Sequence, residues 1–175
     1  MPTTFEFKVS DVQASEMASL LKKHSEEDQQ EVSEYFERFE ELVVSLKELK
    51  EIQVECSQQN WEGMDELPIP VETIEKAREL LFKAAALPSG IPLPSLTPTS
   101  SGWIEMEWYK QKGHRFAIRL NSQGVFIYSG LMGIGKDACG NDVEKDTRGK
   151  SILSDEVFPH EISDNLSRLF NLPIA

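Results

Sequence analysis

The feature that most constrains the fold is a change of hydrophobic period between Gly102 and Gly130. Apolar and polar residues alternate through this segment, as they do in a strand with one buried face. Two glycine-containing stretches, Gln111–Gly113 and Ser122–Gly124, divide the segment into three short strands. Glycine suits such turns because it adopts positive φ without steric strain. The sequence therefore predicts a three-stranded antiparallel meander.

The two turns also predict which residues of the meander face each other. If each turn has three residues with glycine in the left-handed position, Lys110 pairs with His114 and Asn121 with Val125. One face then forms the core and carries Ile104, Met106, Trp108, Phe116, Ile118, Leu120, Phe126 and Tyr128. The other face carries Trp103, Glu105, Glu107, Tyr109, Arg115, Ala117, Arg119 and Ile127.

Charged and aromatic side chains on that second face make it the candidate binding surface. The register places Glu105 directly opposite Arg119, with Glu107 diagonal to it, which predicts a ladder of cross-strand ion pairs. Two amphipathic aromatics share the face, and such residues are typical of interaction surfaces. The alternative is that the linker or the amino-terminal helix covers them. The candidate partner-binding residues are Trp103, Glu105, Glu107, Tyr109, Arg115 and Arg119.

A long helix is predicted over residues 26–50. Ser25 and the acidic residues after it resemble a capping box, which starts a helix of about 23 residues. Apolar residues then recur at spacings of three and four and form one broad stripe: Val32, Tyr35, Phe36, Phe39, Leu42, Val43, Leu46 and Leu49. We expect the stripe to pack on the rest of the chain. The alternatives are a homodimer through the 26–50 helix or packing on a partner helix.

Prolines define the elements on either side of the meander. They bracket a helix at 71–86 and make the linker 87–101 extended. Residues 131–157 lack a clear period and predict a long loop, with a ragged hairpin as the alternative. A short helix after Pro159 closes the chain. A short strand is predicted at Phe5–Val9.

These elements predict an α+β fold, with the 71–86 helix and the closing helix on one face of a sheet of three or more strands. The chain has 175 residues, which is enough for one domain that carries a helical arm. We expect a helical arm at 1–56 and a core domain at 57–175. One continuous domain over 1–175 is the alternative.

The order of these features resembles a group of small bacterial and phage-type proteins without an established activity. In that group a Trp-Asp-Gly-Tyr-like motif precedes a helix and a Gly-Gly-Ile-x-Leu-Glu-Trp-like strand opens a meander. Here Asn60–Gly63 reads Asn-Trp-Glu-Gly, and Trp103–Trp108 reads Trp-Ile-Glu-Met-Glu-Trp. The likeness covers 60–132 and the closing helix. Met64 stands where the group often has an aromatic, and the resemblance implies a fold but no mechanism.

The charge of the chain excludes some partners. Thirty acidic and eighteen basic residues give a net charge of −12, which opposes binding to nucleic acid. Residues 1–60 carry 14 acidic and 6 basic residues, whereas residues 89–130 carry 2 and 4. The acidic end predicts attraction to a basic protein, although an acidic surface that keeps the chain soluble explains the same charge.

Cysteine usage and hydropathy predict a cytoplasmic protein. Cys56 and Cys139 lie far apart and form no Cys-x-x-Cys motif, so neither a disulfide framework nor a zinc site is expected. Met1–Phe7 lacks the pattern of a signal peptide, and no apolar run has the length of a membrane span. We therefore expect no membrane association.

No reaction signature is complete in this sequence. Gly130–Lys136 has the glycine and lysine positions of a phosphate-binding loop, but Asp137 replaces the required hydroxyl and would repel phosphate. Cys139 and His160 are a candidate nucleophile and base with nothing to bring them together. The two strand glutamates have a spacing near that of glycosidase carboxylates, but the neighbouring arginines favour ion pairs over acid catalysis. We predict no catalytic residue, no metal site and no cofactor.

Two functions from different classes remain. The first is a non-enzymatic, acidic protein-binding or regulatory module, comparable to antitoxins and immunity proteins, that engages a basic protein partner. The second is a small hydrolase with an unrecognised active site. An enclosed pocket with converging catalytic groups would favour the hydrolase, and a flat aromatic and acidic surface would favour the binding module.

Overall fold

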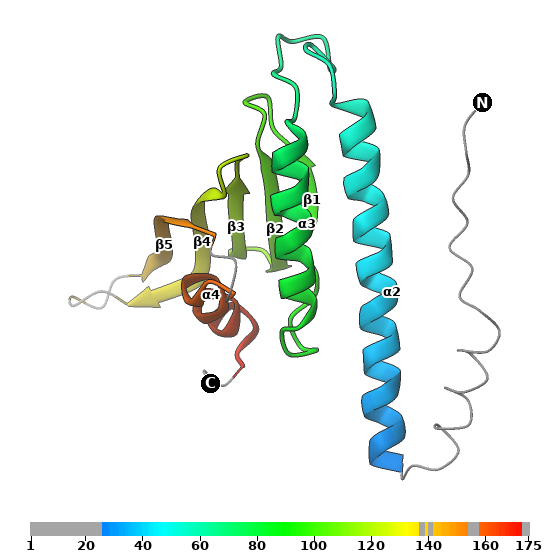
Figure 1. Ribbon diagram of the computed structural model, residues 1–175. Coiled ribbons are helices and arrows are strands. Elements are labelled where there is room, and N and C mark those ends of the chain that lie inside the picture. Colours follow the sequence, from blue (N-terminus) through cyan, green and yellow to red (C-terminus); the bar gives the residue numbers. More distant parts are fainter. Residues whose placement is uncertain (1–25, 137–138, 140–141, 154–157, 173–175) are drawn as a thin grey trace, which may run out of the picture. The chain divides into compact units, whose positions relative to one another are not determined.

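The computed structural model describes residues 26–136, 139, 142–153 and 158–172 (Figure 1). The chain divides into two compact units, residues 1–37 and 38–175. The short strand predicted at Phe5–Val9 lies outside the described residues.

Five antiparallel strands form one sheet in the order β1-β2-β3-β4-β5. Their bounds are β1 Ser95–Pro98, β2 Ile104–Gln111, β3 His114–Leu120, β4 Val125–Lys136 and β5 Asp142–Ile152. Each strand pairs with the next one in the chain, so the sheet is a meander. The predicted α+β fold with an antiparallel meander is therefore confirmed.

The predicted register of β2, β3 and β4 is confirmed except at the first turn. Glu105 pairs with Arg119, as expected from the alternation of side chains. The predicted pair of Lys110 with His114 is wrong, because Gln111 faces His114 and the ladder is irregular between Tyr109 and Gln111. Lys110 is the extra residue of this bulge. Its Nζ donates a hydrogen bond to the Leu169 carbonyl at 3.0 Å, which holds its side chain toward the closing helix α4 (His160–Phe170).

The long loop predicted at 131–157 is wrong for most of its length, and its alternative, a ragged hairpin, is correct, because β4 continues to Lys136 and pairs with β5 through an irregular register. Glycines hide the alternation that would reveal these strands. Gly133 has φ of +85° where the β4–β5 register shifts, and its N–H donates to the Gly113 carbonyl at 2.9 Å. A Cβ on Gly149 would lie 2.3 Å from the hydroxyl of Tyr128, so the tyrosine ring occupies the space of the missing side chain.

Two helices, α3 (Val71–Ala85) and α4 (His160–Phe170), cover one face of the sheet, as predicted (Figure 1). Each begins directly after a proline, Pro70 or Pro159, whose fixed φ suits the start of a helix. The covered sheet face is the predicted core face, and seven of its eight residues are at most 1% exposed: Ile104, Met106, Trp108, Phe116, Ile118, Leu120 and Phe126. The linker predicted at 87–101 is extended only in part: it turns at Pro88–Ile91, and Ser95–Pro98 pairs with β2 as an edge strand.

Helix α2 (Glu26–Glu55) is longer than predicted because neither glycine nor proline interrupts those 30 residues. Only part of its predicted apolar stripe is buried. A row of small and apolar side chains, called the core row below, is buried with the rest of the larger unit: Leu42, Ser45, Leu49, Ile52 and Cys56. A second row, called the open row, has three members that are 38–54% exposed and two half-buried ones: Phe36, Phe39 and Val43, with Val32 and Leu46.

One arginine connects α2 to the end of α3. The Arg38 guanidinium donates to the Ala84 carbonyl at 2.8 Å and to the Ala85 carbonyl at 3.4 Å. The last carbonyls of a helix have no partner within it, and a cation is favourable at that end of the helix dipole. Glu41, one turn along α2, accepts a hydrogen bond from the same guanidinium. Arg38 therefore fixes which side of α2 faces α3.

Candidate functional site

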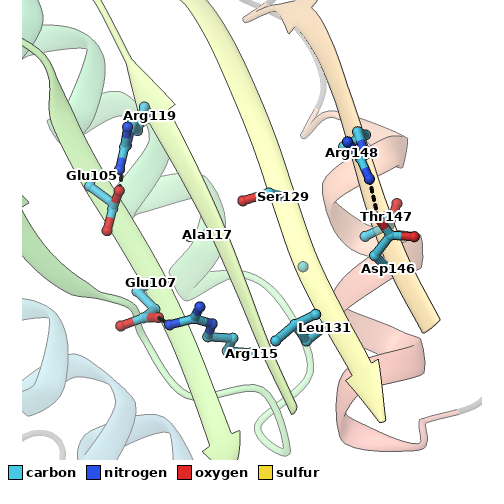
Figure 2. A pocket seen from close by; sticks show the side chains of 11 residues that line it. Glu105, Glu107, Arg115, Ala117, Arg119, Ser129, Leu131, Asp146, Thr147 and Arg148 are labelled. Carbon is cyan, nitrogen blue, oxygen red and sulfur yellow. Dashed lines mark hydrogen bonds and ion pairs between the residues drawn. The ribbon is translucent and has the colours of Figure 1, made fainter. Parts of the chain in front are cut away.

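The sheet face opposite α3 and α4, called the outer sheet face, carries the predicted binding residues. In the register, Glu107 of β2 lies beside Ala117 of β3, followed by Ser129 of β4 and Arg148 of β5. This row crosses the sheet, and Figure 2 shows the side chains around it. Glu105, with its partner arginine, belongs to the next row. The alternation of β2 and β3 was therefore sufficient to predict which residues share this face.

The charges of the outer sheet face largely neutralise each other. Arg119 Nε donates to Glu105 Oε2 at 2.5 Å, and Arg115 Nη1 lies 3.9 Å from Glu107 Oε1. The two arginine side chains are 56% and 58% exposed, so water screens both pairs. The predicted ladder of cross-strand ion pairs is present, with a close pair, Glu105–Arg119, and a more distant pair, Glu107–Arg115. The face consequently offers hydrogen-bond donors and acceptors but little net charge.

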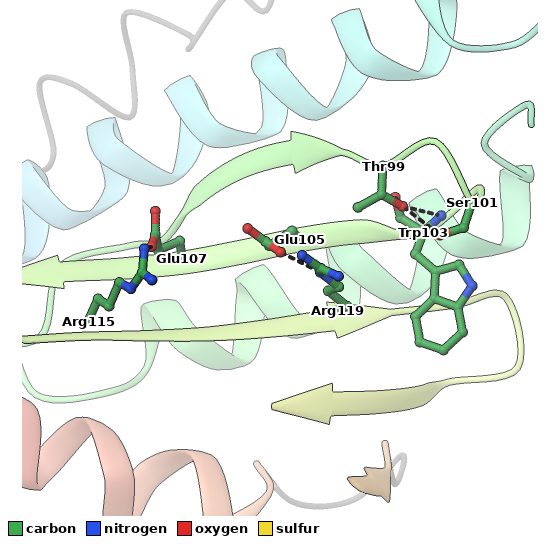
Figure 3. A network of polar contacts seen from close by, with 7 residues as sticks. All are labelled: Thr99, Ser101, Trp103, Glu105, Glu107, Arg115 and Arg119. Atoms are coloured by element: carbon green, nitrogen blue, oxygen red, sulfur yellow. Dashed lines mark hydrogen bonds and ion pairs between the residues drawn. The ribbon is translucent and has the colours of Figure 1, made fainter. Parts of the chain in front are cut away.

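The two candidate aromatics have different surroundings. Trp103 is half-buried directly before β2, where its backbone N–H donates to Thr99 Oγ1 at 3.1 Å (Figure 3). Thr99 N–H also donates to the Trp103 carbonyl at 2.9 Å, which holds the turn before β2. Tyr109 is 60% exposed beside Arg115. The alternative that another segment covers these aromatics therefore fails for Tyr109.

A shallow depression of about 410 Å³ lies in the outer sheet face (Figure 2). Short side chains, Ala117 and Ser129, lie at its centre because they face each other across β3 and β4. Six of its lining residues were missed by sequence reasoning: Ser129, Gly130, Leu131, Asp146, Thr147 and Arg148. Those on β5 were missed because that strand was expected to be a loop. The alternation of Asp146, Arg148 and Lys150 was the available signal.

The depression does not resemble a hydrolytic site. Its three carboxylates each form an ion pair with one of its three arginines, Arg148 with Asp146 on the same strand. A catalytic acid typically lies in an apolar pocket, whereas each of these carboxylates lies beside an arginine on a solvent-exposed face. Within the described ranges, no group of three or more histidine, cysteine or acidic side chains could hold a metal ion.

The two cysteines have different surroundings. Cys56 is buried at the end of α2, and burial, followed by the charges of Glu55 and Glu62, raises the pKa of its thiol. A raised pKa is the opposite of what a thiol nucleophile requires. Cys139 is exposed between β4 and β5, and His160 is the first residue of α4. The phosphate-loop-like stretch belongs to β4 rather than to a loop before a helix.

The motif behind the family resemblance forms a loop that is closed by its own carboxylate. Glu66 is only 3% exposed, and its Oε2 accepts hydrogen bonds from the backbone N–H of Met64 at 3.0 Å and of Glu62 at 3.3 Å. Burial would raise the pKa of Glu66, but the backbone N–H groups of the loop outweigh it and lower that pKa. Asn60 caps the same loop by accepting from the Asp65 N–H at 2.9 Å. Glu66 thus has a structural role between α2 and α3.

The strongest charge lies on α2. This helix has eleven acidic and three basic residues, a net charge of −8, against −12 for the whole chain. The open row runs along this acidic helix, and Phe39 is 54% exposed on it. Exposed aromatic side chains on a charged helix are a recognised feature of binding surfaces.

Comparison with known proteins found no match. No family model, no curated protein and no solved structure matches the chain. Among the described residues, no helix has both the length and the apolar character that crossing a membrane requires. The function is therefore inferred from the geometry of the site.

Proposed function

We propose that the protein is a non-enzymatic binding or regulatory module that engages a basic protein partner. The observation that carries this proposal is the combination, on α2, of a net charge of −8 with exposed aromatic side chains. Long-range charge accelerates the encounter with an oppositely charged partner, and buried aromatic anchors then supply most of the affinity.

The outer sheet face is proposed to contribute shape and hydrogen bonds rather than attraction. Its ion pairs are already formed within the chain, so a partner there gains little from its own charge. Tyr109 offers a large, exposed amphipathic surface next to the shallow depression. A partner that contacts both surfaces would use α2 for steering and Tyr109 for specificity.

The experiment is an affinity capture from the native host at low salt, followed by elution with raised salt. Binding that depends on the acidic helix is weakened when Glu37 and Glu40, both exposed on α2, are changed to Gln. The matched control changes Glu72 and Glu75, exposed on α3, to Gln and removes the same charge. We expect capture by the wild type and the control and reduced capture by the α2 variant.

A second pair of variants tests the outer sheet face. Trp103→Ala with Tyr109→Ala removes both candidate aromatics without touching α2. Reduced capture by this variant assigns the sheet face to the interface. If no protein is retained at low salt, or if retention is the same for the wild type and all variants, the proposed function is wrong.

A further inference from the structure

We propose that the partner segment is a basic amphipathic α-helix that lies lengthwise along the open row of α2. This inference rests on the proposed function and specifies the kind of partner. The open row is defined by Val32, Phe36, Phe39, Val43 and Leu46. In the part of the chain that the structure describes, nothing buries its three central members, which are 38%, 54% and 48% exposed.

The spacing of the open row indicates that the segment that binds it is a helix. Its members follow each other at intervals of four, three, four and three residues. This is the a and d pattern of a coiled coil, in which the side chains of one helix insert between those of another. From Val32 to Leu46 the row extends about 21 Å along the helix, at about 1.5 Å per residue. That length accommodates about four turns of a partner helix.

The same helix buries a row of similar spacing inside the protein. The core row has intervals of three, four, three and four residues and is buried in the core. Leu49, near its centre, is 1% exposed. The open row repeats the pattern on a neighbouring side of the helix with larger side chains, including two phenylalanines. Exposure of such a row to water is unfavourable, and covering it with a second helix lowers the free energy.

The charge of α2 determines the chemistry of the occupant. Exposed glutamates accompany the open row, among them Glu37 and Glu40. A second copy of this chain would bring another net charge of −8 against the first, which opposes a homodimer through α2. A helix with lysine or arginine beside its apolar seam can instead pair with Glu40, which has the flanking e position of the open row, and is attracted by the net charge of the rest of α2. The homodimer therefore becomes an outcome of the test rather than the proposal.

The test uses a synthetic peptide of about 21 residues with leucine at a and d and with lysine and arginine at the flanking e and g positions. A control peptide keeps the leucines and has glutamate at e and g. Both carry a fluorophore, and their binding to the full chain is followed by fluorescence anisotropy at low salt. We expect the basic peptide to bind, its circular dichroism to show increased helicity on binding, and the acidic peptide not to bind.

Two protein variants locate the binding. The open-row variant combines Phe36→Ser, Phe39→Ser and Val43→Ser and should weaken binding of the basic peptide about tenfold or more. The matched control combines Val44→Ser on α2 with Phe82→Ser on α3, which are 67% and 51% exposed and lie outside the row. It should bind as the wild type does. Thermal unfolding of both variants verifies that they remain folded.

The outcomes separate this inference from the proposed function. If the basic peptide fails to bind, or binds the open-row variant as well as the wild type, the helical occupant is wrong. A native partner whose capture depends on Glu37 and Glu40 but not on the open row would retain the function and discard the helix. If sedimentation equilibrium shows a dimer that the open-row variant abolishes, a second copy occupies the row and the inference is overturned.

Discussion

The core row and the open row of α2 have the same kind of spacing, but the core row is buried and the open row is largely exposed. The core row includes Ser45 and Cys56, yet both are buried, at 7% and 2% exposure. The open row includes Phe36 and Phe39, yet they are 38% and 54% exposed. The more hydrophobic row is therefore the one left uncovered. Packing against the core of the larger unit, and not hydrophobicity alone, decides which side of α2 is buried.

This difference assigns separate tasks to the two rows. A row that is buried in the core stabilises the fold, and truncation of its side chains leaves a cavity. A row that stays in water contributes little to folding and can be used for binding. The two rows can be distinguished by experiments that compare stability with binding.

The largest effect is expected from Leu49→Ala in the core row. Leu49 is 1% exposed, and removal of its side chain should lower the free energy of unfolding by about 2–5 kcal/mol. Urea denaturation measures this loss. The control is Val44→Ala on the same helix, which is 67% exposed and should change stability by less than about 0.5 kcal/mol. Equal losses for both variants would show that α2 does not pack by the core row.

A smaller loss is expected from Arg38→Ala, which tests what orients the two rows. The guanidinium donates to the Ala84 and Ala85 carbonyls, and its loss should cost about 1.5–3 kcal/mol because a charged donor is removed from helix-end carbonyls. Thermal unfolding provides the measurement. Lys47→Ala is the control, because its ion pair with Glu51 is exposed and 3.9 Å long. An unchanged midpoint for Arg38→Ala would refute the anchoring role.

A still smaller effect is expected from Glu66→Gln, in the loop that leads from α2 to α3. The pKa of Glu66 is lowered from 4.5, so its contribution to stability is fully present above that value and is lost as the pH falls through the lower folded pKa. The variant should be less stable near neutral pH and should lose this part of the acid dependence.

Unfolding midpoints between about pH 7 and about pH 3 test the Glu66 prediction. Glu62→Gln is the control, because Glu62 contributes its backbone N–H to the loop and its side chain does not bind there. A parallel pH dependence for the wild type and Glu66→Gln would contradict the structural role of this carboxylate.

The parts of the fold that were predictable are those in which local pattern and tertiary environment agree. In β2 and β3 each apolar residue faces the core, so alternation alone predicted the register and the grouping of Glu105 with Arg119. In β5 the tyrosine ring of Tyr128 occupies the space above Gly149, and the alternation is carried by charged residues. The contact of Tyr128 with Gly149 leaves no local signal, and the charged alternation of Asp146, Arg148 and Lys150 was interpreted as part of a loop, so Arg148 was missed.

The site on α2 was predictable only as a single broad stripe. Spacings of three and four residues are satisfied by both rows at once, so periodicity placed Leu42 and Val43 on the same face. The structure separates them, because Leu42 is 7% exposed and Val43 is 48% exposed. The contacts of Arg38 were equally hidden, since its partners are backbone carbonyls of a distant helix, which any sequence provides.

The smallest effect on stability is expected from Phe39→Ser combined with Val43→Ser in the open row. Both side chains are already about half in water, so the free energy of unfolding should change by no more than about 0.5 kcal/mol. Urea denaturation next to Leu49→Ala makes the comparison direct. A loss as large as that of Leu49→Ala would mean that the open row is covered in solution. Sedimentation equilibrium would then decide between a second copy, which gives a dimer, and another segment of the same chain, which leaves a monomer. If the double variant is instead stable and monomeric, the open row contributes little to folding. Its exposure is then explained by a role in binding.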